Sequence, residues 1–222
     1  MAQRTVHYLL GEILIREGVG DIDRFRVGNL LPDAYTGYEN RFRTHFVKDI
    51  QTEAGRVAFC DLESFYDRFR DRMQTDSLYL GYYMHLVEDA CYRVFWRSLG
   101  LQGKIRTSDD IRKLHRDYRI LNGYIVEHYG LNCEARMPER FEYEPINSIY
   151  PFEAGRLLAD LENDFKDRPQ GKTSLLREEG LDAFIDTYTD KCREVLRQVK
   201  TTGRSVPSQF LTWPKVNYQF NK

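Results

Sequence analysis

The chain has 222 residues, with 33 lysine and arginine side chains against 34 aspartate and glutamate, so its formal net charge is −1. Hydrophobic residues make up 41% of the chain and aromatic residues 14%, which excludes disorder and allows a packed core without disulfides. The near-neutral charge argues against a general binder of duplex nucleic acid. No apolar run reaches the roughly 18 residues of a transmembrane helix, so we expect no integral membrane segment.

The cysteines and the N-terminal segment indicate a cytoplasmic protein. The four cysteines lie far apart and form no C-x-x-C pair, which excludes a thiolate zinc ribbon: Cys60, Cys91, Cys133 and Cys192. The apolar stretch near the N-terminus is interrupted by Glu12, so it does not read as a signal peptide. We therefore expect reduced thiols.

Apolar residues recur at helical spacing through most of the chain, and alternating strand patterns are scarce. In chain order, this pattern predicts helices at about 5–16, 56–73, 77–99, 107–129, 152–165 and 181–199. A capping box beginning at Thr107 marks the start of the fourth of these helices.

Two segments between the predicted helices lack regular patterning. Residues 21–54 contain Gly28, Pro32 and Gly37 and are rich in aromatic residues, so we expect a functional loop there. Residues 137–151 contain three prolines and are predicted to form a surface connection. The tail from Thr201 is expected to dock on the body through its aromatic residues: Phe210, Trp213, Tyr218 and Phe220.

These elements predict an all-α fold, a single-domain multi-helix bundle that spans residues 1–222 with a metal site between its helices. The metal-binding core is expected at about 5–130. The C-terminal helices and tail are expected at about 150–222.

His85 and Asp89 are the strongest candidates for metal ligands. A spacing of four residues places both side chains on one face of the predicted helix 77–99, one turn apart. The same helix is otherwise apolar and aromatic, and a carboxylate among such neighbours is costly to bury unless it is paired or bound to a cation. An ordinary His–Asp pair on the helix surface is the alternative.

Three further residues complete an ordered set: His7 on the first predicted helix, Asp33 after Leu31-Pro32, and His45 within Arg43-Thr44-His45-Phe46. With Tyr79-Leu80-Gly81-Tyr82 preceding His85 and Asp89, the pattern over about residues 5–97 resembles the zinc-dependent phospholipase C superfamily. That superfamily also contains the single-strand-specific zinc nucleases. The chain is most similar to its small bacterial members.

The resemblance implies a role for each of these residues. Asp89 corresponds to a carboxylate that bridges two metal ions. Asp33, His45 and His85 would complete the coordination of one ion, and His7 would hold the second together with Asp89. The resemblance also implies zinc as the cofactor, although histidine and aspartate ligands accept other divalent ions.

Three features of the family are missing, and together they reduce the expected number of ions to one or two. The family's N-terminal tryptophan, whose amino group is a ligand, has no counterpart in a chain that begins Met1-Ala2. The histidine expected six residues after the bridging aspartate is replaced by Phe95, and the following His-x-x-x-Glu motif is absent.

A second group of polar residues lies on the predicted helix 107–129. His115, Arg119 and Asn122 share one face, while Asp117 points elsewhere. These four residues are candidates to orient a metal ligand or to contact the substrate, with a solvated helix face as the alternative. Arg43 and Arg93 are candidates to accept an anionic group, and Arg93 could equally pair with a surface acid.

The leading functional hypothesis is a zinc-dependent hydrolase that acts on a small-molecule phosphoester with metal-activated water as the nucleophile. Asp33 and Asp89 are its candidate catalytic residues, because either carboxylate could orient the attacking water. The first alternative is a helical protein with a structural or sensing metal site that binds a partner or small molecule without catalysis. The second is a metal-free helical interaction module. The sequence does not indicate the oligomeric state.

Overall fold

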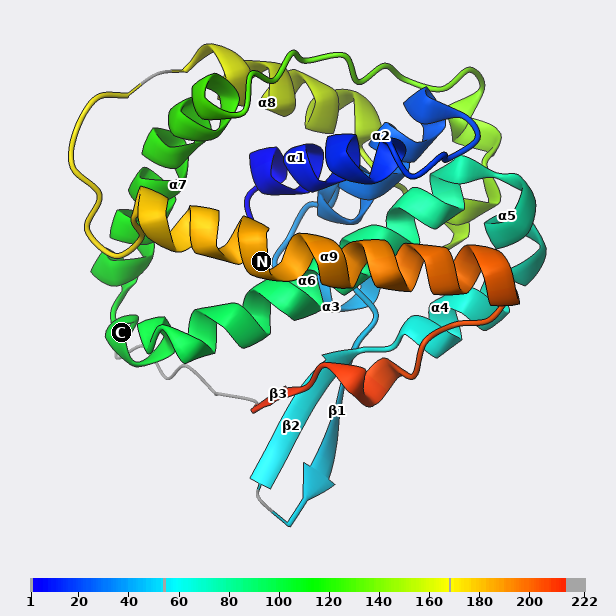
Figure 1. Cartoon of the computed structure of the whole chain (residues 1–222), viewed down its shortest axis with the longest axis horizontal. Helices are drawn as coiled ribbons and strands as arrows, with labels where there is room; N and C mark the ends of the chain where they lie inside the picture. The colour runs from blue at the N-terminus through cyan, green and yellow to red at the C-terminus, as the bar shows by residue number, and fades with distance from the viewer. Residues whose placement is uncertain (1, 54, 168, 215–222) are drawn as a thin grey trace.

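Helix α6 (Ser77–Ser98) runs through the centre of the protein in the computed structural model, which describes residues 2–53, 55–167 and 169–214 (Figure 1). Every residue of α6 from Ser77 to Tyr92 is buried. The helix begins where the Asp76 side chain accepts a hydrogen bond from the backbone N–H of Leu78. Helices α1, α2, α4, α5 and α9 pack around it, which explains why apolar residues occur around its whole circumference.

The described part of the chain contains eight other α-helices: α1 (Arg4–Ile15), α2 (Ile22–Leu30), α3 (Asn40–Thr44), α4 (Leu62–Arg68), α5 (Arg70–Thr75), α7 (Ser108–His128), α8 (Ala154–Lys166) and α9 (Glu178–Thr202). Helix α1 contacts α2, α6, α7, α8 and α9, so it also lies inside the bundle. Short 3-10 helices form several connections, including η1 (Leu31–Asp33) and η2 (Leu101–Lys104).

A small antiparallel sheet accompanies the helices. Its strands follow the order β1 (Val47–Thr52), β2 (Gly55–Cys60) and β3 (Trp213–Pro214), with Val47 opposite Cys60. The β1–β2 hairpin projects away from the helices (Figure 1). The fold is therefore mostly helical, and the prediction of an all-α fold omitted this sheet.

The predicted helix at 56–73 is wrong in its first part. Gly55 has a positive φ of 115° and reverses the chain, so the following residues pair with β1 and do not form a helix. Helix α4 begins only after Asp61, whose side chain accepts from the N–H of Ser64. At Phe69 the backbone leaves helical geometry, with φ −124° and ψ 25°, which separates α4 from α5.

The predicted irregular segment 21–54 also differs from the structure, since it contains α2, α3 and β1. Helix α2 begins at the side chain of Asp21, which accepts from the N–H of Arg24. The other predicted helices are confirmed to within a few residues, including the capping box of α7 between Thr107 and Asp110.

The surface connection at 137–151 contains two 3-10 helices, η3 (Phe141–Tyr143) and η4 (Pro145–Ser148). In the tail, Trp213 is buried, as predicted. Phe210 ends the 3-10 helix η5 (Ser208–Phe210). Tyr218 and Phe220 lie outside the described residues.

Two glycines allow α2 and α6 to pack at very short range. A Cβ atom at Gly81 would lie 2.3 Å from the backbone oxygen of Phe25, and one at Gly28 would lie 2.0 Å from that of Leu78. No side chain larger than hydrogen fits at either contact without moving a helix. This approach brings Asn29 of α2 within hydrogen-bonding distance of two polar side chains of α6.

We expect Gly81→Ala to destabilise the protein by about 1–3 kcal/mol, because the added methyl group overpacks a contact between two backbones. Urea unfolding measures the change. Gly155→Ala is the matched control, since a Cβ atom there meets nothing within 4 Å and alanine is the better helix former. Equal stability of the two variants would contradict close backbone packing between α2 and α6.

Candidate metal centre

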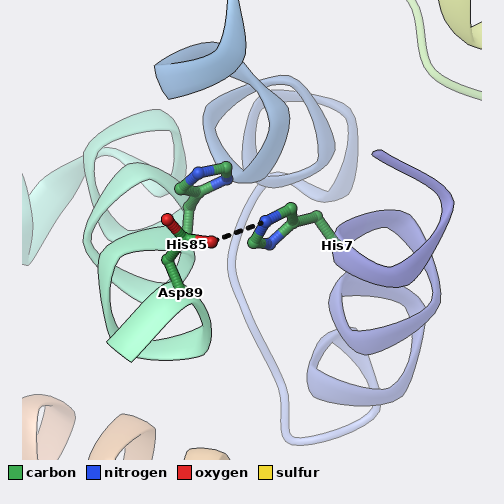
Figure 2. Close-up of side chains that lie close together, drawn as sticks. All are labelled: His7, His85 and Asp89. Atoms are coloured by element: carbon green, nitrogen blue, oxygen red, sulfur yellow. Dashed lines mark ion pairs between the residues drawn. The ribbon is translucent and has the colours of Figure 1, made fainter. Parts of the chain in front are cut away.

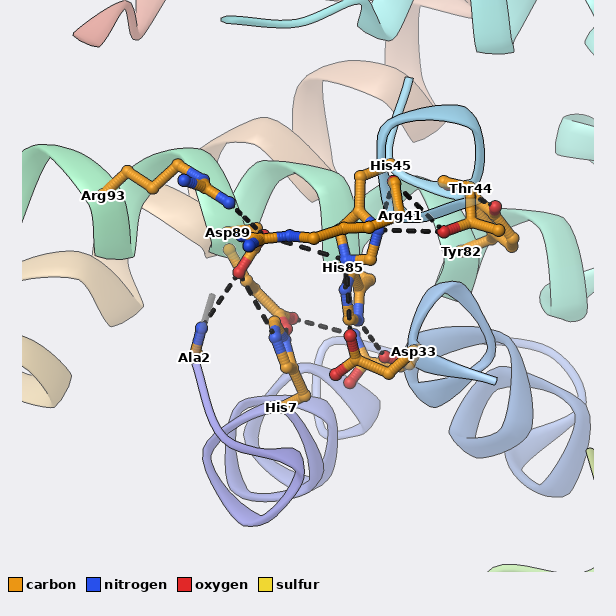
Figure 3. A network of polar contacts seen from close by, with 12 residues as sticks. Ala2, His7, Asp33, Arg41, Thr44, His45, Tyr82, His85, Asp89 and Arg93 are labelled. Atoms are coloured by element: carbon orange, nitrogen blue, oxygen red, sulfur yellow. Dashed lines mark hydrogen bonds and ion pairs between the residues drawn. The ribbon is translucent and has the colours of Figure 1, made fainter. Parts of the chain in front are cut away.

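The structure brings the five predicted ligands together from four elements. His7 comes from α1, and His85 and Asp89 come from α6 (Figure 2). Asp33 ends η1, and His45 directly follows α3 (Figure 3). The side chains of all but Asp33 are completely buried, and that of Asp33 is 10% exposed.

The ligand atoms form two overlapping groups, His7–His85–Asp89 and Asp33–His45–His85, in each of which all ligand atoms lie within 4.8 Å of one another. Asp89 directs one oxygen to each side: Oδ1 is 3.7 Å from Nε2 of His7, and Oδ2 is 3.8 Å from Nε2 of His45. On the second side, Oδ1 of Asp33 is 3.3 Å from the same nitrogen of His45. Oδ1 of Asp89 also accepts from the backbone N–H of Ala2 at 3.0 Å, and His85 is the residue common to both groups.

Each of the three imidazoles is anchored through its Nδ1 atom. In His7 this atom is 2.7 Å from Oε2 of Glu88, and in His85 it is 2.8 Å from the backbone oxygen of Asn29. In His45 it is 3.1 Å from the backbone oxygen of Arg41. These partners are acceptors, so Nδ1 carries the proton, and in the neutral ring the lone pair resides on Nε2.

The three Nε2 atoms consequently converge on the centre of the site. Those of His45 and His85 are only 3.2 Å apart. Two nitrogen lone pairs at that distance repel each other unless a proton or a cation lies between them. Hydrogen bonding of the remote ring nitrogen to a carboxylate or a carbonyl is the usual arrangement of metal-binding histidines.

Several ligand atoms have no partner of their own. His7 Nε2, Asp33 Oδ1 and Asp89 Oδ2 are buried and make no hydrogen bond. Leaving a buried polar group unsatisfied costs about 1–3 kcal/mol, and more for a charged group. A divalent cation would satisfy all three atoms, and imidazole nitrogen and carboxylate oxygen are ligands that zinc accepts. The residues present therefore fit one or two such ions.

The centre strongly perturbs the ionisation of its residues. Burial lowers the pKa of His7, but the adjacent carboxylates of Asp89 and Glu88 outweigh this effect and raise it to about 10. Burial dominates at His85 and holds its pKa well below the usual value. Burial would raise the pKa of Asp33, but the contact with His45 holds it below its usual range. The surroundings therefore favour the protonated form of His7 and disfavour that of His85.

A strained backbone position orients His45. The next residue, Phe46, has a positive φ of 50°, which is uncommon for a residue with a side chain. The backbone oxygen of Phe46 accepts a hydrogen bond from the N–H of Asp61 at 2.8 Å, which holds the turn in place. This turn lets His45 face the centre while the chain leaves into β1.

Glu88 is a buried residue beside the centre that the sequence did not reveal. Its carboxylate accepts from Nδ2 of Asn29 at 2.9 Å and bonds to the ring of His7. Burial raises the pKa of Glu88. The residue follows His85 by three positions and precedes Asp89, so the sequence places it near the ligands, but its role depends on how α1 packs against α6.

A cleft of about 560 Å³ adjoins the centre at Asp33. Helices α1, α3, α7 and α8 and the residues after η1 contribute to its walls. Its lining includes Tyr35, Arg41 and Tyr118 as well as Asp33. The centre is therefore buried on most sides and reachable on one.

Three of the four candidates on α7 line this cleft: His115, Arg119 and Asn122. Asn122 accepts from the hydroxyl of Thr5 at 2.6 Å, and Arg119 pairs with Asp167. The structure does not place Asp117 beside the predicted ligands or the cleft. Its buried carboxylate accepts from three successive backbone N–H groups at 174–176. Asp117 therefore holds a loop and faces neither the centre nor the cleft.

Of the two arginines that the sequence offered as anion-binding candidates, only Arg93 lies near the centre. Arg93 has its Nη2 atom 3.8 Å from Oδ2 of Asp89 and packs over the ring of Trp213. Arg43 is exposed on α3 and does not line the cleft. The residue that does reach the cleft is Arg41, one half-turn earlier in the same helix.

Comparisons of the chain with protein-family models, with curated proteins and with solved structures found no match. The family resemblance of the ordered ligands therefore stays a prediction. Within the described ranges, no helix is long and apolar enough to cross a membrane. The cysteines are unpaired, and Cys133 alone among them is exposed.

We expect zinc binding to release a proton from His7. With a pKa of about 10, this side chain is protonated in the metal-free protein at pH 7–9, and binding through Nε2 displaces the proton. The release should approach one proton per protein at pH 8 and decline as the pH rises through about 10. Calorimetric titration in buffers of different ionisation enthalpy measures it. A buffer-independent enthalpy at pH 8 would contradict the protonated state of His7.

Glu88→Gln should weaken metal binding by about 10- to 100-fold, because it removes the charge that orients the ring of His7 and increases its basicity. Competition with a chromophoric chelator gives the affinity. The matched control is Glu162→Gln, which alters an exposed helix pair with Lys166. If both variants bind zinc as the wild type does, Glu88 does not support the centre.

Proposed function

We propose that this protein is a metal-dependent hydrolase of phosphoesters, with zinc as its metal in one or two positions. The observation that carries the proposal is the position of Asp33. This residue belongs to a buried set of three histidines and two aspartates and also lines the cleft. A ligand set that meets solvent on one side leaves room for water and substrate, as hydrolytic metal sites require.

The charges at the site suit an anionic substrate. The ligands include two carboxylates, Asp33 and Asp89, so two divalent ions would leave the assembled centre positive. When bound, zinc would polarise a phosphoryl oxygen and lower the pKa of a coordinated water molecule towards about 7. Both effects favour attack by water on a phosphoester at neutral pH.

The two aspartates would have different roles. Both oxygens of Asp89 face histidines, and its side chain is fully buried, so it would hold ions and not contact the substrate. Asp33 is partly exposed at the edge of the cleft. Its carboxylate would accept a hydrogen bond from the attacking water and orient it towards the ester.

A structural or sensing metal site is the second candidate. The complete burial of four of the five ligands favours it, because such sites are closed to water. The two candidates differ in turnover, since both require the metal but only the hydrolase acts on an ester.

The test compares zinc-loaded and chelator-stripped wild type on a chromogenic phosphomonoester and a chromogenic phosphodiester, with the metal content measured in parallel. We expect at least one zinc ion per chain, and hydrolysis that disappears on stripping and returns with zinc. Asp89→Ala should lower metal affinity and activity by more than about 100-fold, since even the loss of a hydrogen-bond partner of a ligand costs 10- to 100-fold.

Asp33→Asn serves as the second variant in case Asp89→Ala does not fold, because it preserves size and sits at the edge of the core. It should retain part of the zinc and lose most of the activity. Zinc binding without turnover of either ester would favour the structural site. Absence of zinc from the wild type after loading would contradict both proposals.

A further inference from the structure

Arg41 extends from α3 into the cleft and carries a guanidinium group with an unsatisfied atom. Its Nη2 atom is buried and makes no hydrogen bond, and no ion pair joins Arg41 to any acid among the described residues. In the view of Figure 3 its side chain passes in front of His85 and Asp89, and the ion pairs of Asp89 are with His7, His45 and Arg93. The ring of Tyr38, 5.8 Å away, is its one cation–π neighbour among the described residues.

The other arginines that line the cleft are neutralised by neighbouring acids. Arg4 lies 2.9 Å from Asp164, and Arg119 lies 2.7 Å from Asp167. Arg156 pairs with Glu153 at 3.3 Å, and Asp160 lies close to both Arg4 and Arg156. These pairs contribute little net charge to the cleft, whereas the charge of Arg41 remains available to a ligand.

Burying part of an unpaired guanidinium is unfavourable, so its position is best explained by an anion that completes it. The planar fork of arginine fits the oxygens of a phosphate or a carboxylate better than an ammonium group does. Arg41 also fixes the centre, because its backbone oxygen bonds to the ring of His45. Arg41 thus orients His45 through its backbone oxygen and presents a positive charge through its side chain.

We propose that Arg41 binds a terminal phosphoryl oxygen of the substrate and selects phosphomonoesters over phosphodiesters. This inference rests on the proposed function. A monoester has three terminal oxygens and carries up to two negative charges, whereas a diester has two terminal oxygens and one charge. When two terminal oxygens face the metal centre, a monoester has a third terminal oxygen that the guanidinium group of Arg41 can bind. In a diester, that position carries the oxygen of the second ester group.

The direct test measures binding of inorganic phosphate to the zinc-loaded and to the chelator-stripped protein by calorimetry, with no turnover involved. Arg41→Gln should weaken phosphate binding by about 10-fold or more, the usual effect of losing a charge-assisted hydrogen bond. Arg41→Lys should restore part of it. Arg43→Gln is the matched control, since Arg43 is exposed on the same short helix and does not line the cleft.

The second measurement gives specificity as the ratio of kcat/KM for a chromogenic monoester to that for the corresponding diester. Arg41→Gln should lower this ratio by about 10-fold, mainly through the monoester, with zinc content and melting temperature unchanged. Arg43→Gln should leave the ratio unchanged. A merely structural role of Arg41 would lower both rates equally and would change the zinc content or the melting temperature.

The outcomes separate this inference from the proposed function. Unchanged phosphate binding in Arg41→Gln, or an equal loss in Arg43→Gln, would overturn the assignment of Arg41 even if the protein hydrolyses esters. Phosphate binding that depends on Arg41 in a wild type that hydrolyses neither ester would overturn the hydrolase and leave the anion site in place. A wild type that prefers the diester would overturn the proposed selectivity.

Discussion

The convergence of three imidazole nitrogens in the buried interior is the constraint around which the protein is organised. Each ring is anchored at Nδ1 by a carboxylate or a backbone oxygen, so each presents Nε2 to its neighbours. Such an arrangement is unfavourable by itself, because it opposes lone pairs and leaves carboxylate oxygens unpaired. The surrounding fold must therefore supply enough packing energy to hold it, and a bound cation would relieve the conflict.

Close packing of α2 on α6 supplies the geometry. Gly28 and Gly81 let the two backbones touch, and this contact places Asn29 beside both His85 and Glu88. The backbone oxygen of Asn29 accepts from His85, and its side-chain amide donates to Glu88. A single residue on α2 therefore positions His85, a predicted ligand, and the carboxylate that bonds to His7.

The sequence predicted which histidines and aspartates come together better than it predicted the elements that carry them. His85 and Asp89 follow from helical spacing alone, because a separation of four residues fixes their common face. Asp33 and His45 could be found only by their order in a family-like pattern, since their approach depends on η1, α3 and the left-handed turn at Phe46.

Other features had no local signal. Gly28 resembles a helix breaker in the sequence, and its true role is visible only when the neighbouring helix is in place. The strand at 55–60 contains apolar residues that also fit a helical period, and its pairing with β1 decides between the two. Arg43 and Arg41 are two residues apart, yet only Arg41 reaches the cleft, because the helix directs them to different sides.

The anchoring of Asp117 has a consequence for the chain that leads into α9. Its carboxylate accepts from three successive backbone N–H groups at 174–176, just before α9 begins. These residues line a pocket beside α6 and α9 and not the cleft at Asp33. An aspartate on α7 therefore fixes the place where α9 begins, so the length of the connection from α8 can vary without displacing that helix.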